Sequence, residues 1–376
     1  MIPYTKHTIA SDDIKSVIKA LTSGWLTQGS AVSEFEKALS QYCGTKYAAV
    51  FNSGTAALHA AVFCSEIGEG DEVVTTPLSF VATSNSVLYE SGTVVFADVD
   101  YETGMLDPKE VERKIGKKTK AVITVDYGGH PSFLKELKAI CKKNNLVFIN
   151  DACHSLGATY FGKRVGPQAD ITAFSFHPAK GITTAEGGAI VTNSKKFYER
   201  ALVFRNHGVT KDSKKYISKE EKSDPWYFEM HDLGYNYRLS DINCALGISQ
   251  IKKLDKFIEA KAKIAQYYTE KINGDARFVT PKKTKGNESA WHLYPVRLAD
   301  KSINKKDLFK KFNENGIFPQ VHFIPIHTHP YYKERFGYKW GDYPKAESFY
   351  REEISLPMYP TLKKGDIDKV IRVLKG

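Results

Sequence analysis

The chain has 376 residues and a net charge of +11, from 54 Lys and Arg against 43 Asp and Glu. Its length predicts one large and one smaller domain, because a single hydrophobic core rarely grows beyond about 250–300 residues. Hydrophobic residues make up 42% of the chain, and no apolar run approaches the roughly 20 residues of a membrane helix. The lysines alternate with glutamates instead of forming a basic arm, so we expect neither a nucleic-acid partner nor a membrane partner.

The five cysteines show no paired or C-x-x-C spacing, which predicts free thiols in a reducing compartment. The N-terminal residues also lack the apolar segment of a secretory signal. We therefore expect a cytoplasmic protein without disulfides. The cysteines are Cys43, Cys64, Cys141, Cys153 and Cys244.

Two helices are predicted before residue 47. The first begins around Ser11, where acidic residues lie near the positive end of the helix dipole, and it ends near Gly24. The second is amphipathic and spans Ser33–Tyr42, with Phe35 and Leu39 on one face.

Apolar runs of strand length alternate with helical stretches from residue 47 onward. Because these runs are hydrophobic throughout, they predict a mostly parallel α/β sheet with helices on both faces. Ligands of such sheets bind beyond the carboxyl ends of the strands, so the residues that follow each strand are candidates for a site. The seven predicted strands are residues 48–51, 72–76, 94–97, 121–125, 146–149, 171–176 and 189–192.

Three of these strand ends carry candidate residues. After the first strand, the small residues of Asn52–Leu58 begin a helix whose free amides can hold a phosphate, although such residues also serve as ordinary caps. After the second strand comes Phe80, which considered alone is more often a core residue than a cofactor contact. After the fifth strand comes Asp151, which either needs a cationic or donor partner or caps the next turn.

Lys180 lies in a turn between the last two predicted strands, among small residues. Partial burial lowers the pKa of an ammonium group and leaves a neutral amine that can react with a carbonyl group. The alternative is a loop lysine that extends into water. Dinucleotide, P-loop, zinc-protease and serine-hydrolase motifs are all missing from the sequence. His327 and His329 resemble a metal site but lack a third ligand at suitable spacing, so we expect no metal.

The large domain is predicted to span residues 1–250, and a linker helix with a smaller α+β domain to span 251–376. Residues 211–230 are predicted to form an exposed loop, and one long helix is predicted from Ile242 to about Asn273. The remainder mixes a strand at 291–298, a helix at 305–315, a loop at 320–332 and a last helix from Lys364.

Five motifs in combination resemble the fold-type I, pyridoxal 5'-phosphate (PLP)-dependent aminotransferases that act on nucleotide-linked keto sugars. The resemblance covers nearly the whole chain, from Leu26 to the final helix. It implies an enzyme with a seven-stranded, mostly parallel sheet and a homodimer with shared active sites. The motifs are NSGTAAL at 52–58, TTPLSFVATSN at 75–85, DACHSLGA at 151–158, FSFHPAKGITTAEGGAIVTN at 174–193 and GYNYRLSDINCALG at 234–247.

Within this DegT-like family the motifs look closest to the transaminases of pseudaminic acid biosynthesis. That resemblance implies amino transfer from L-glutamate to the C4 keto group of a UDP-linked 4-keto-6-deoxy-N-acetylhexosamine. The 4-amino-4-deoxy-L-arabinose transaminases share Ala290–Leu293 and Tyr331–Phe336, so they remain an alternative, as does a C3 aminotransferase. Dehydratases of the family carry histidine where this chain has Lys180. A binding protein that reuses the fold without turnover is a further alternative.

The resemblance also implies roles for individual residues. Lys180 is the residue that attaches PLP, Asp151 pairs with its pyridine nitrogen, His154 lies near its phenolic oxygen and Phe80 stacks on its ring. The phosphate is expected to contact Thr55, Ala56, Ser175 and, from the other subunit, Asn236. The residues expected to bind substrate are Thr27, Arg238, His322 and His327, with Arg238 as the first candidate for the donor carboxylate.

Overall fold

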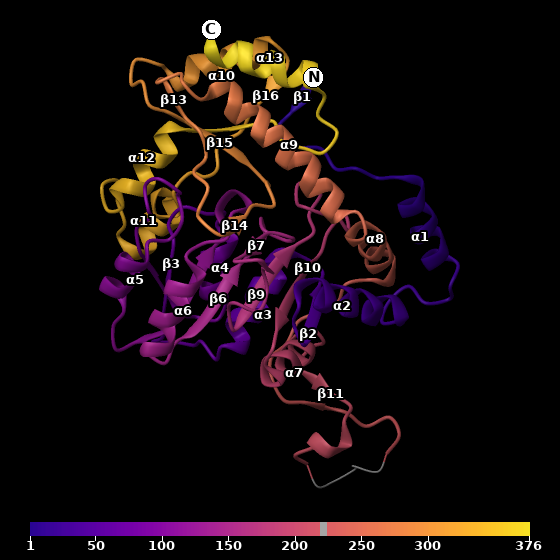
Figure 1. The fold of residues 1–376 in the computed structure, drawn as a ribbon. Coiled ribbons are helices and arrows are strands. Elements are labelled where there is room, and N and C mark those ends of the chain that lie inside the picture. Colours follow the sequence, from indigo (N-terminus) through magenta and orange to yellow (C-terminus); the bar gives the residue numbers. More distant parts are fainter. Residues whose placement is uncertain (219–223) are drawn as a thin grey trace.

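The computed structural model describes residues 1–218 and 224–376. Its centre is a seven-stranded sheet with the order β2-β10-β9-β6-β5-β3-β4, and only β10 runs antiparallel to its neighbours (Figure 1). All seven predicted strands lie in this sheet, so the predicted α/β architecture is confirmed. The strands are β2 Tyr47–Phe51, β3 Glu72–Thr75, β4 Thr93–Phe96, β5 Thr119–Val125, β6 Val147–Asp151, β9 Ile171–Ser175 and β10 Gly188–Thr192.

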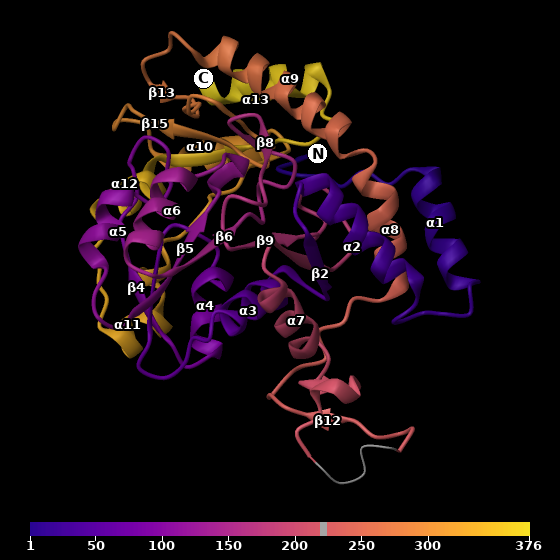
Figure 2. The same ribbon diagram turned by 60° about the horizontal axis from the view of Figure 1, so that its bottom comes forward.

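Helices cover both faces of the sheet (Figure 2). Successive strand residues point to opposite faces, so neighbours such as Ala49 and Val50 belong to different hydrophobic cores. One core includes α3 Gly54–Cys64, α4 Ala82–Tyr89 and α7 Lys195–Phe204. The opposite face carries α2 Ser30–Cys43, α5 Pro108–Lys114 and α6 Leu134–Lys143. Because both faces are buried, the strands need the continuous hydrophobic runs from which they were predicted.

The predicted helix from Ile242 to Asn273 is two helices, so that prediction is wrong. Helix α8 (Asp241–Ile251) packs against α1 (Ser11–Leu21) and α2, and α9 (Leu254–Ile272) continues into the C-terminal part. Lys253, at the break, forms ion pairs with Asp12 at 3.0 Å and Asp13 at 2.5 Å, both in the first turn of α1. The chain changes direction at this break because α8 packs against α1 and α2, whereas α9 packs in the C-terminal part.

A separate hydrophobic core lies in the C-terminal part. It is built on the antiparallel strands β13 (Phe278–Val279), β15 (Tyr294–Leu298) and β17 (Glu353–Leu356), with α9, α10 (Lys305–Glu314) and α13 (Lys364–Lys375). Strand β1 (Ile2–Pro3) pairs in parallel with β16 (Ile317–Phe318), which brings the N-terminus into the same core. This separate core agrees with a division near residue 250, which stays a prediction.

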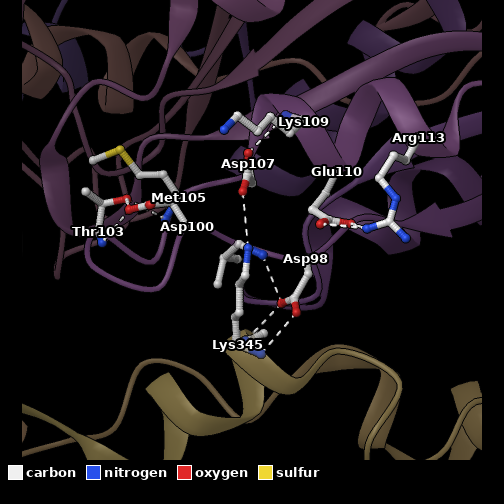
Figure 3. Close-up of polar contacts among 11 residues, drawn as sticks. Asp98, Asp100, Thr103, Met105, Asp107, Lys109, Glu110, Arg113 and Lys345 are labelled. Atoms are coloured by element: carbon white, nitrogen blue, oxygen red, sulfur yellow. Dashed lines mark hydrogen bonds and ion pairs between the residues drawn. The ribbon is translucent and has the colours of Figure 1, made fainter.

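Asp98, just after β4, attaches the C-terminal part to the edge of the large sheet (Figure 3). Its carboxylate accepts the backbone N–H groups of Lys345 at 3.0 Å and Ala346 at 2.9 Å, in the first turn of α12 (Pro344–Glu352). The Lys345 ammonium also lies 3.3 Å from Asp107 Oδ2. An acidic side chain at a helix N-terminus satisfies free amides and complements the helix dipole, so this contact fixes α12 against the sheet.

The remaining elements are short. Of the predicted loop 211–230, residues 219–223 lie outside the described residues. Strand β11 (Val209–Thr210), just before this loop, pairs antiparallel with β12 (Glu229–Met230), at its end. Within the described part of the chain, every helix is too short or too polar to span a lipid bilayer. These elements are β7 Thr159–Tyr160, β8 Lys163–Arg164, β11 Val209–Thr210, β12 Glu229–Met230, β14 Asn287–Glu288, α11 Pro330–Phe336, and the 3₁₀ turns Tyr127–Gly129, Ser213–Lys215 and Ile326–Thr328.

Candidate active site

A cavity of about 450 Å³ opens at the carboxyl ends of the parallel strands, where the topology of the sheet predicts a ligand. It lies between the N-terminus of α3, the end of β6 and the turn after β9, with further residues from the C-terminal part. Six of the predicted site residues line it: Thr55, Phe80, Asp151, Ser175, Lys180 and His322.

The turn that carries Lys180 is anchored at both ends by the sheet. The Phe176 N–H donates to Gly187 O at 2.8 Å, and the Thr184 N–H donates to Phe176 O at 3.0 Å, so the turn closes on itself. Inside it, the Lys180 N–H donates to His177 O at 2.8 Å. The lysine therefore projects from a fixed backbone and not from a loose loop.

Lys180 is partly buried in this turn. Desolvation lowers the pKa of its ammonium group, and the nearby Cys153 and Asp151 act in the opposite direction. The net effect is a lowered pKa, which increases the fraction of neutral amine near neutral pH. This is the protonation state that a reactive lysine requires.

Asp151 ends β6 and is only 4% exposed. Its Oδ2 accepts a hydrogen bond from Thr83 Oγ1 at 2.7 Å, and its Oδ1 accepts the N–H of Cys153 at 3.2 Å. A buried carboxylate requires such donors, and here they also fix its orientation in the wall of the cavity.

His154 lies beside the cavity with its ring 4.2 Å from that of His292 and 5.9 Å from that of Phe323. Burial, with contributions from the charge of Lys180 and from His322, holds the pKa of His154 well below its usual range. Its ring is therefore neutral. Its Nδ1 atom is buried and has no hydrogen-bond partner among the described residues. A bound ligand can supply the hydrogen bond that such a buried polar atom lacks.

The N-terminus of α3 forms the other end of the cavity. The first amides of a helix have no partner within it, and they favour anions. Here Ser53 Oγ accepts the N–H of Ala56 at 3.0 Å, which leaves the amides of Gly54 and Thr55 to face a ligand. A Cβ atom at Gly54 would lie 2.6 Å from that of Ser175, so only glycine lets the helix begin this close to β9.

These groups fit the predicted cofactor. The α3 amides and the Ser175 hydroxyl suit a phosphate group, Asp151 suits a protonated ring nitrogen, and Lys180 suits a carbonyl carbon. His154 Nδ1 offers a partner for a further polar atom. Ala56 was also expected at the phosphate, but its amide is already bonded to Ser53, and the residue does not line the cavity.

Three predicted residues lie away from this cavity in the single chain. Asn236 is exposed, and Arg238 donates to Asn206 Oδ1 at 2.7 Å in the wall of a separate cavity of about 320 Å³. Thr27 is exposed and forms an isolated bridge with Ser240. Their roles as cofactor or substrate contacts stay predictions.

His327 is also outside the cavity and is fully buried. Its Nε2 lies 3.1 Å from Glu347 Oε1, and its ring packs against Tyr343. This side chain holds α12 in place, and its position offers no support for the predicted contact with substrate. Within residues 1–218 and 224–376, no group of three or more His, Cys, Asp or Glu side chains could hold a metal ion.

Several residues that line the cavity were not expected from the sequence. Cys153 follows Asp151 and Glu186 follows Lys180 within the same motifs, so their proximity along the chain was an available signal. Tyr4, His292 and Phe323 come from distant segments, and only the packing of the C-terminal part brings them to the cavity.

Comparison with known proteins gives matches along almost the whole chain. The model of the DegT/DnrJ/EryC1/StrS aminotransferase family matches residues 7–375. A UDP-4-amino-4,6-dideoxy-N-acetyl-beta-L-altrosamine transaminase from Campylobacter jejuni is 39% identical over 370 residues, which cover 97% of this chain and 94% of that protein.

Solved structures agree with the sequence matches. PseC from Helicobacter pylori, an aminotransferase involved in the biosynthesis of pseudoaminic acid, is 35% identical with a TM-score of 0.92, covering 100% of this chain and 98% of that chain. The PLP form of Spr1654 from Streptococcus pneumoniae is 28% identical with a TM-score of 0.91, covering 100% and 97%.

The predicted fold type and family are confirmed by these matches, and PLP is the cofactor that the family uses. The site described above, with a lysine, an aspartate and a helix N-terminus around one cavity, is consistent with that chemistry. The chain belongs to the DegT/DnrJ/EryC1/StrS aminotransferase family.

Proposed function

We propose that the protein transfers an amino group from L-glutamate to the C4 keto group of UDP-2-acetamido-2,6-dideoxy-β-L-arabino-hex-4-ulose, using PLP. The observation that carries this proposal is the convergence of Lys180, Asp151 and the open amides of α3 on one cavity. Relatives named as altrosamine transaminases, at 37–39% identity over most of the chain, support a C4 keto sugar as the acceptor.

The residues present would hold PLP at three points. The amides of Gly54 and Thr55 with the Ser175 hydroxyl would bind its phosphate, Asp151 its ring nitrogen and Lys180 its carbonyl carbon. When bound, PLP supplies an electron-withdrawing ring that makes the hydrogen next to a substrate amino group acidic.

Lys180 moves the proton in this scheme. Its Nζ, kept partly neutral by desolvation, accepts a proton from a substrate carbon and later releases it. The closed turn around Lys180 keeps the amine at the cavity when the amine is not covalently attached to PLP. Asp151 would hold a proton on the ring nitrogen of PLP. Its carboxylate is oriented for this contact by the hydrogen bonds from Thr83 and from the N–H of Cys153.

A homodimer with shared sites belongs to the proposal. Asn236 and Arg238 do not line the cavity of their own chain, and a second copy would supply them. Large apolar side chains also remain exposed, including Phe80 (59%) at the cavity and Trp25 (66%). Such side chains are often covered by a partner subunit. We also place the enzyme in the cytoplasm, because all five cysteines are free.

Product analysis tests the proposed reaction. The PLP-loaded protein is incubated with L-glutamate and a panel of UDP- and dTDP-linked 3- and 4-keto sugars, and the products are analysed by mass spectrometry and NMR. We expect one equivalent of 2-oxoglutarate for each new C4–N bond. A new bond at C3, or a preference for the 4-keto-L-arabinose acceptor, would replace the proposal by the corresponding alternative, and loss of water without amino transfer would indicate a dehydratase.

A further inference from the structure

A chain of hydrogen bonds leads from the cavity into the C-terminal core through His322. The His322 Nδ1 atom lies 2.8 Å from Ser355 Oγ, and Ser355 Oγ is hydrogen-bonded to Glu353 Oε1. Glu353 Oε2 accepts the backbone N–H of His322 at 2.8 Å, which closes the loop. Ser355 and Glu353 are fully buried, and they lie on the same face of β17 because they are two residues apart.

This arrangement leaves only Nε2 of His322 to meet a ligand. The ring lines the same cavity as Lys180, its Nδ1 is taken by Ser355, and it also packs against Phe323 and Tyr4. A neutral imidazole carries one N–H proton. If that proton lies on Nδ1, which faces Ser355, then Nε2 in the cavity can only accept a hydrogen bond; if Nδ1 is unprotonated, Nε2 carries the proton and donates.

The position of each proton follows from the protonation state of Glu353. When Glu353 is ionised, both of its oxygens accept, so the Ser355 hydroxyl donates to it and accepts the Nδ1–H of His322. Nε2 then carries a lone pair. When Glu353 is protonated, its Oε2 still accepts a backbone N–H, so the proton lies on Oε1 and points to Ser355. The serine hydroxyl then donates to Nδ1, and the ring proton lies on Nε2.

Charged and titratable groups from several elements surround the hydrogen bonds between Glu353, Ser355 and His322. Lys305 on α10, Arg297 on β15 and Tyr127 after β5 face Glu353, yet Lys305 donates to Tyr350 O at 2.7 Å and Arg297 pairs with Glu352 at 3.4 Å. Burial raises the pKa of Glu353 to about 7, and the hydrogen bonds from Ser355 and from the backbone N–H of His322, together with the Lys305 charge, oppose this rise.

His322 faces Lys180, His154 and His292 across the cavity. Burial, with the Lys180 charge, lowers the pKa of His322 to about 3, so its ring stays neutral near pH 7 and only its tautomer can change.

We propose that Glu353 and Ser355 are positioning residues that set which nitrogen of His322 carries the proton, and thereby whether Nε2 donates or accepts a hydrogen bond at a substrate oxygen. The identity of that oxygen rests on the proposed function: a keto oxygen only accepts, so a keto sugar selects the Nε2–H form. We call the hydrogen-bonded series Glu353–Ser355–His322 the relay. It favours binding of the keto substrate when Glu353 is protonated.

The tautomer of His322 can be observed without any substrate. We would record ¹⁵N shifts of the imidazole nitrogens in the PLP-loaded protein and assign the His322 signals from their loss in His322→Gln. In the wild type we expect Nε2–H at about pH 6 and Nδ1–H at about pH 8. The same tautomer at both pH values would overturn the proposal.

Glu353→Gln gives the decisive comparison. Its amide oxygen must accept the backbone N–H of His322, so its NH₂ group donates to Ser355 and fixes the Nε2–H tautomer at both pH values. Glu347→Gln is the matched control, because it removes another buried carboxylate of the C-terminal part, which bonds to His327 and Arg351 and to none of the groups named around Glu353. The control should switch as the wild type does. A Glu353→Gln protein that also switches would overturn the proposal.

Kinetics supply a second measurement. KM for the keto sugar should rise about tenfold in the wild type between about pH 6 and pH 8, because the binding form falls from about nine-tenths to one-tenth of the population. Glu353→Gln should lose this pH dependence, Ser355→Ala should lose the link between pH and KM, and Ser355→Thr should restore it. Unchanged pH dependence in Glu353→Gln contradicts the relay. If no keto sugar is turned over, the proposed function fails while the NMR result still decides the relay.

Discussion

Thr83 donates its hydroxyl to Asp151 Oδ2 at 2.7 Å, and this hydrogen bond joins the first turn of α4 to the end of β6. Because an ionised carboxylate only accepts, the Thr83 proton is committed to Asp151, and Ser79 can only donate to Thr83 across their 2.9 Å contact. Two hydroxyl groups in series, neither of which lines the cavity, therefore stabilise the carboxylate of Asp151.

Thr83→Val keeps the shape of the side chain and removes this donor. A hydrogen bond to a charged group contributes about 1.5–3 kcal/mol, so we expect kcat/KM to fall about 10- to 100-fold. Thr83→Ser retains the hydroxyl and should stay near the wild-type rate. Steady-state kinetics with circular dichroism to monitor folding make the test, and equal rates for the two variants would show that the hydrogen bond is not used.

Lys180→Ala should abolish turnover and remove the visible absorption of the covalently attached cofactor, because the reactive amine is lost. Lys163→Ala, at an exposed position on β8, serves as the control and should behave as the wild type. Borohydride reduction of the wild type followed by peptide mapping should place the pyridoxyl group on Lys180. A label on any other residue, or normal kcat in Lys180→Ala, would end the assignment.

Shared sites predict complementation between two inactive variants. Lys180→Ala and Asn236→Ala subunits, co-expressed and purified through different tags, would form heterodimers in which one site has both native residues. Heterodimers isolated through both tags should show about half of the wild-type rate per total site. Activity that never exceeds that of the separate variants would show that Asn236 acts in its own subunit or not at all.

His130 predicts a loss of stability in acid. Burial, with a contribution from the Lys283 charge, lowers the pKa of His130 to about 4. The unfolded chain takes up a proton below about pH 6.5 while the folded protein does not, so the free energy of unfolding falls as the pH falls from about 6.5 to 4.

His130→Gln should remove this contribution. Urea unfolding at about pH 7 and pH 5 should show a loss about 2 kcal/mol smaller in His130→Gln than in the wild type. His7→Gln, at an exposed site, should keep the wild-type difference. Identical losses in all three proteins would contradict the assigned role of burial.

The sheet could be predicted from the sequence because its strands are buried on both faces and appear as continuous apolar runs. The same logic located Asp151 and Lys180, which follow strands directly. The break at Lys253 could not be predicted, since it depends on ion pairs with Asp12 and Asp13, more than 200 residues away in the chain.

The relay behind His322 was equally out of reach. His322 was expected to bind substrate, but nothing in local spacing connects it with Ser355 and Glu353, which sit on a strand about 30 residues later. His327 is also a histidine of the predicted loop 320–332, like His322, but its side chain contacts Glu347 on α12 and does not line the cavity. Polar contacts between distant segments are set by packing, which periodicity does not report.

The reversed direction of β10 constrains how this protein can change during evolution. Because β9 leaves the sheet at the cavity and β10 returns there, residues 176–187 form a tether of fixed length between two strands whose register is locked. One inserted or deleted residue would either rotate Lys180 out of the cavity or shift the register of β10 and invert its buried faces. We expect natural relatives to vary freely in length around residues 211–230 and to conserve the length of this tether.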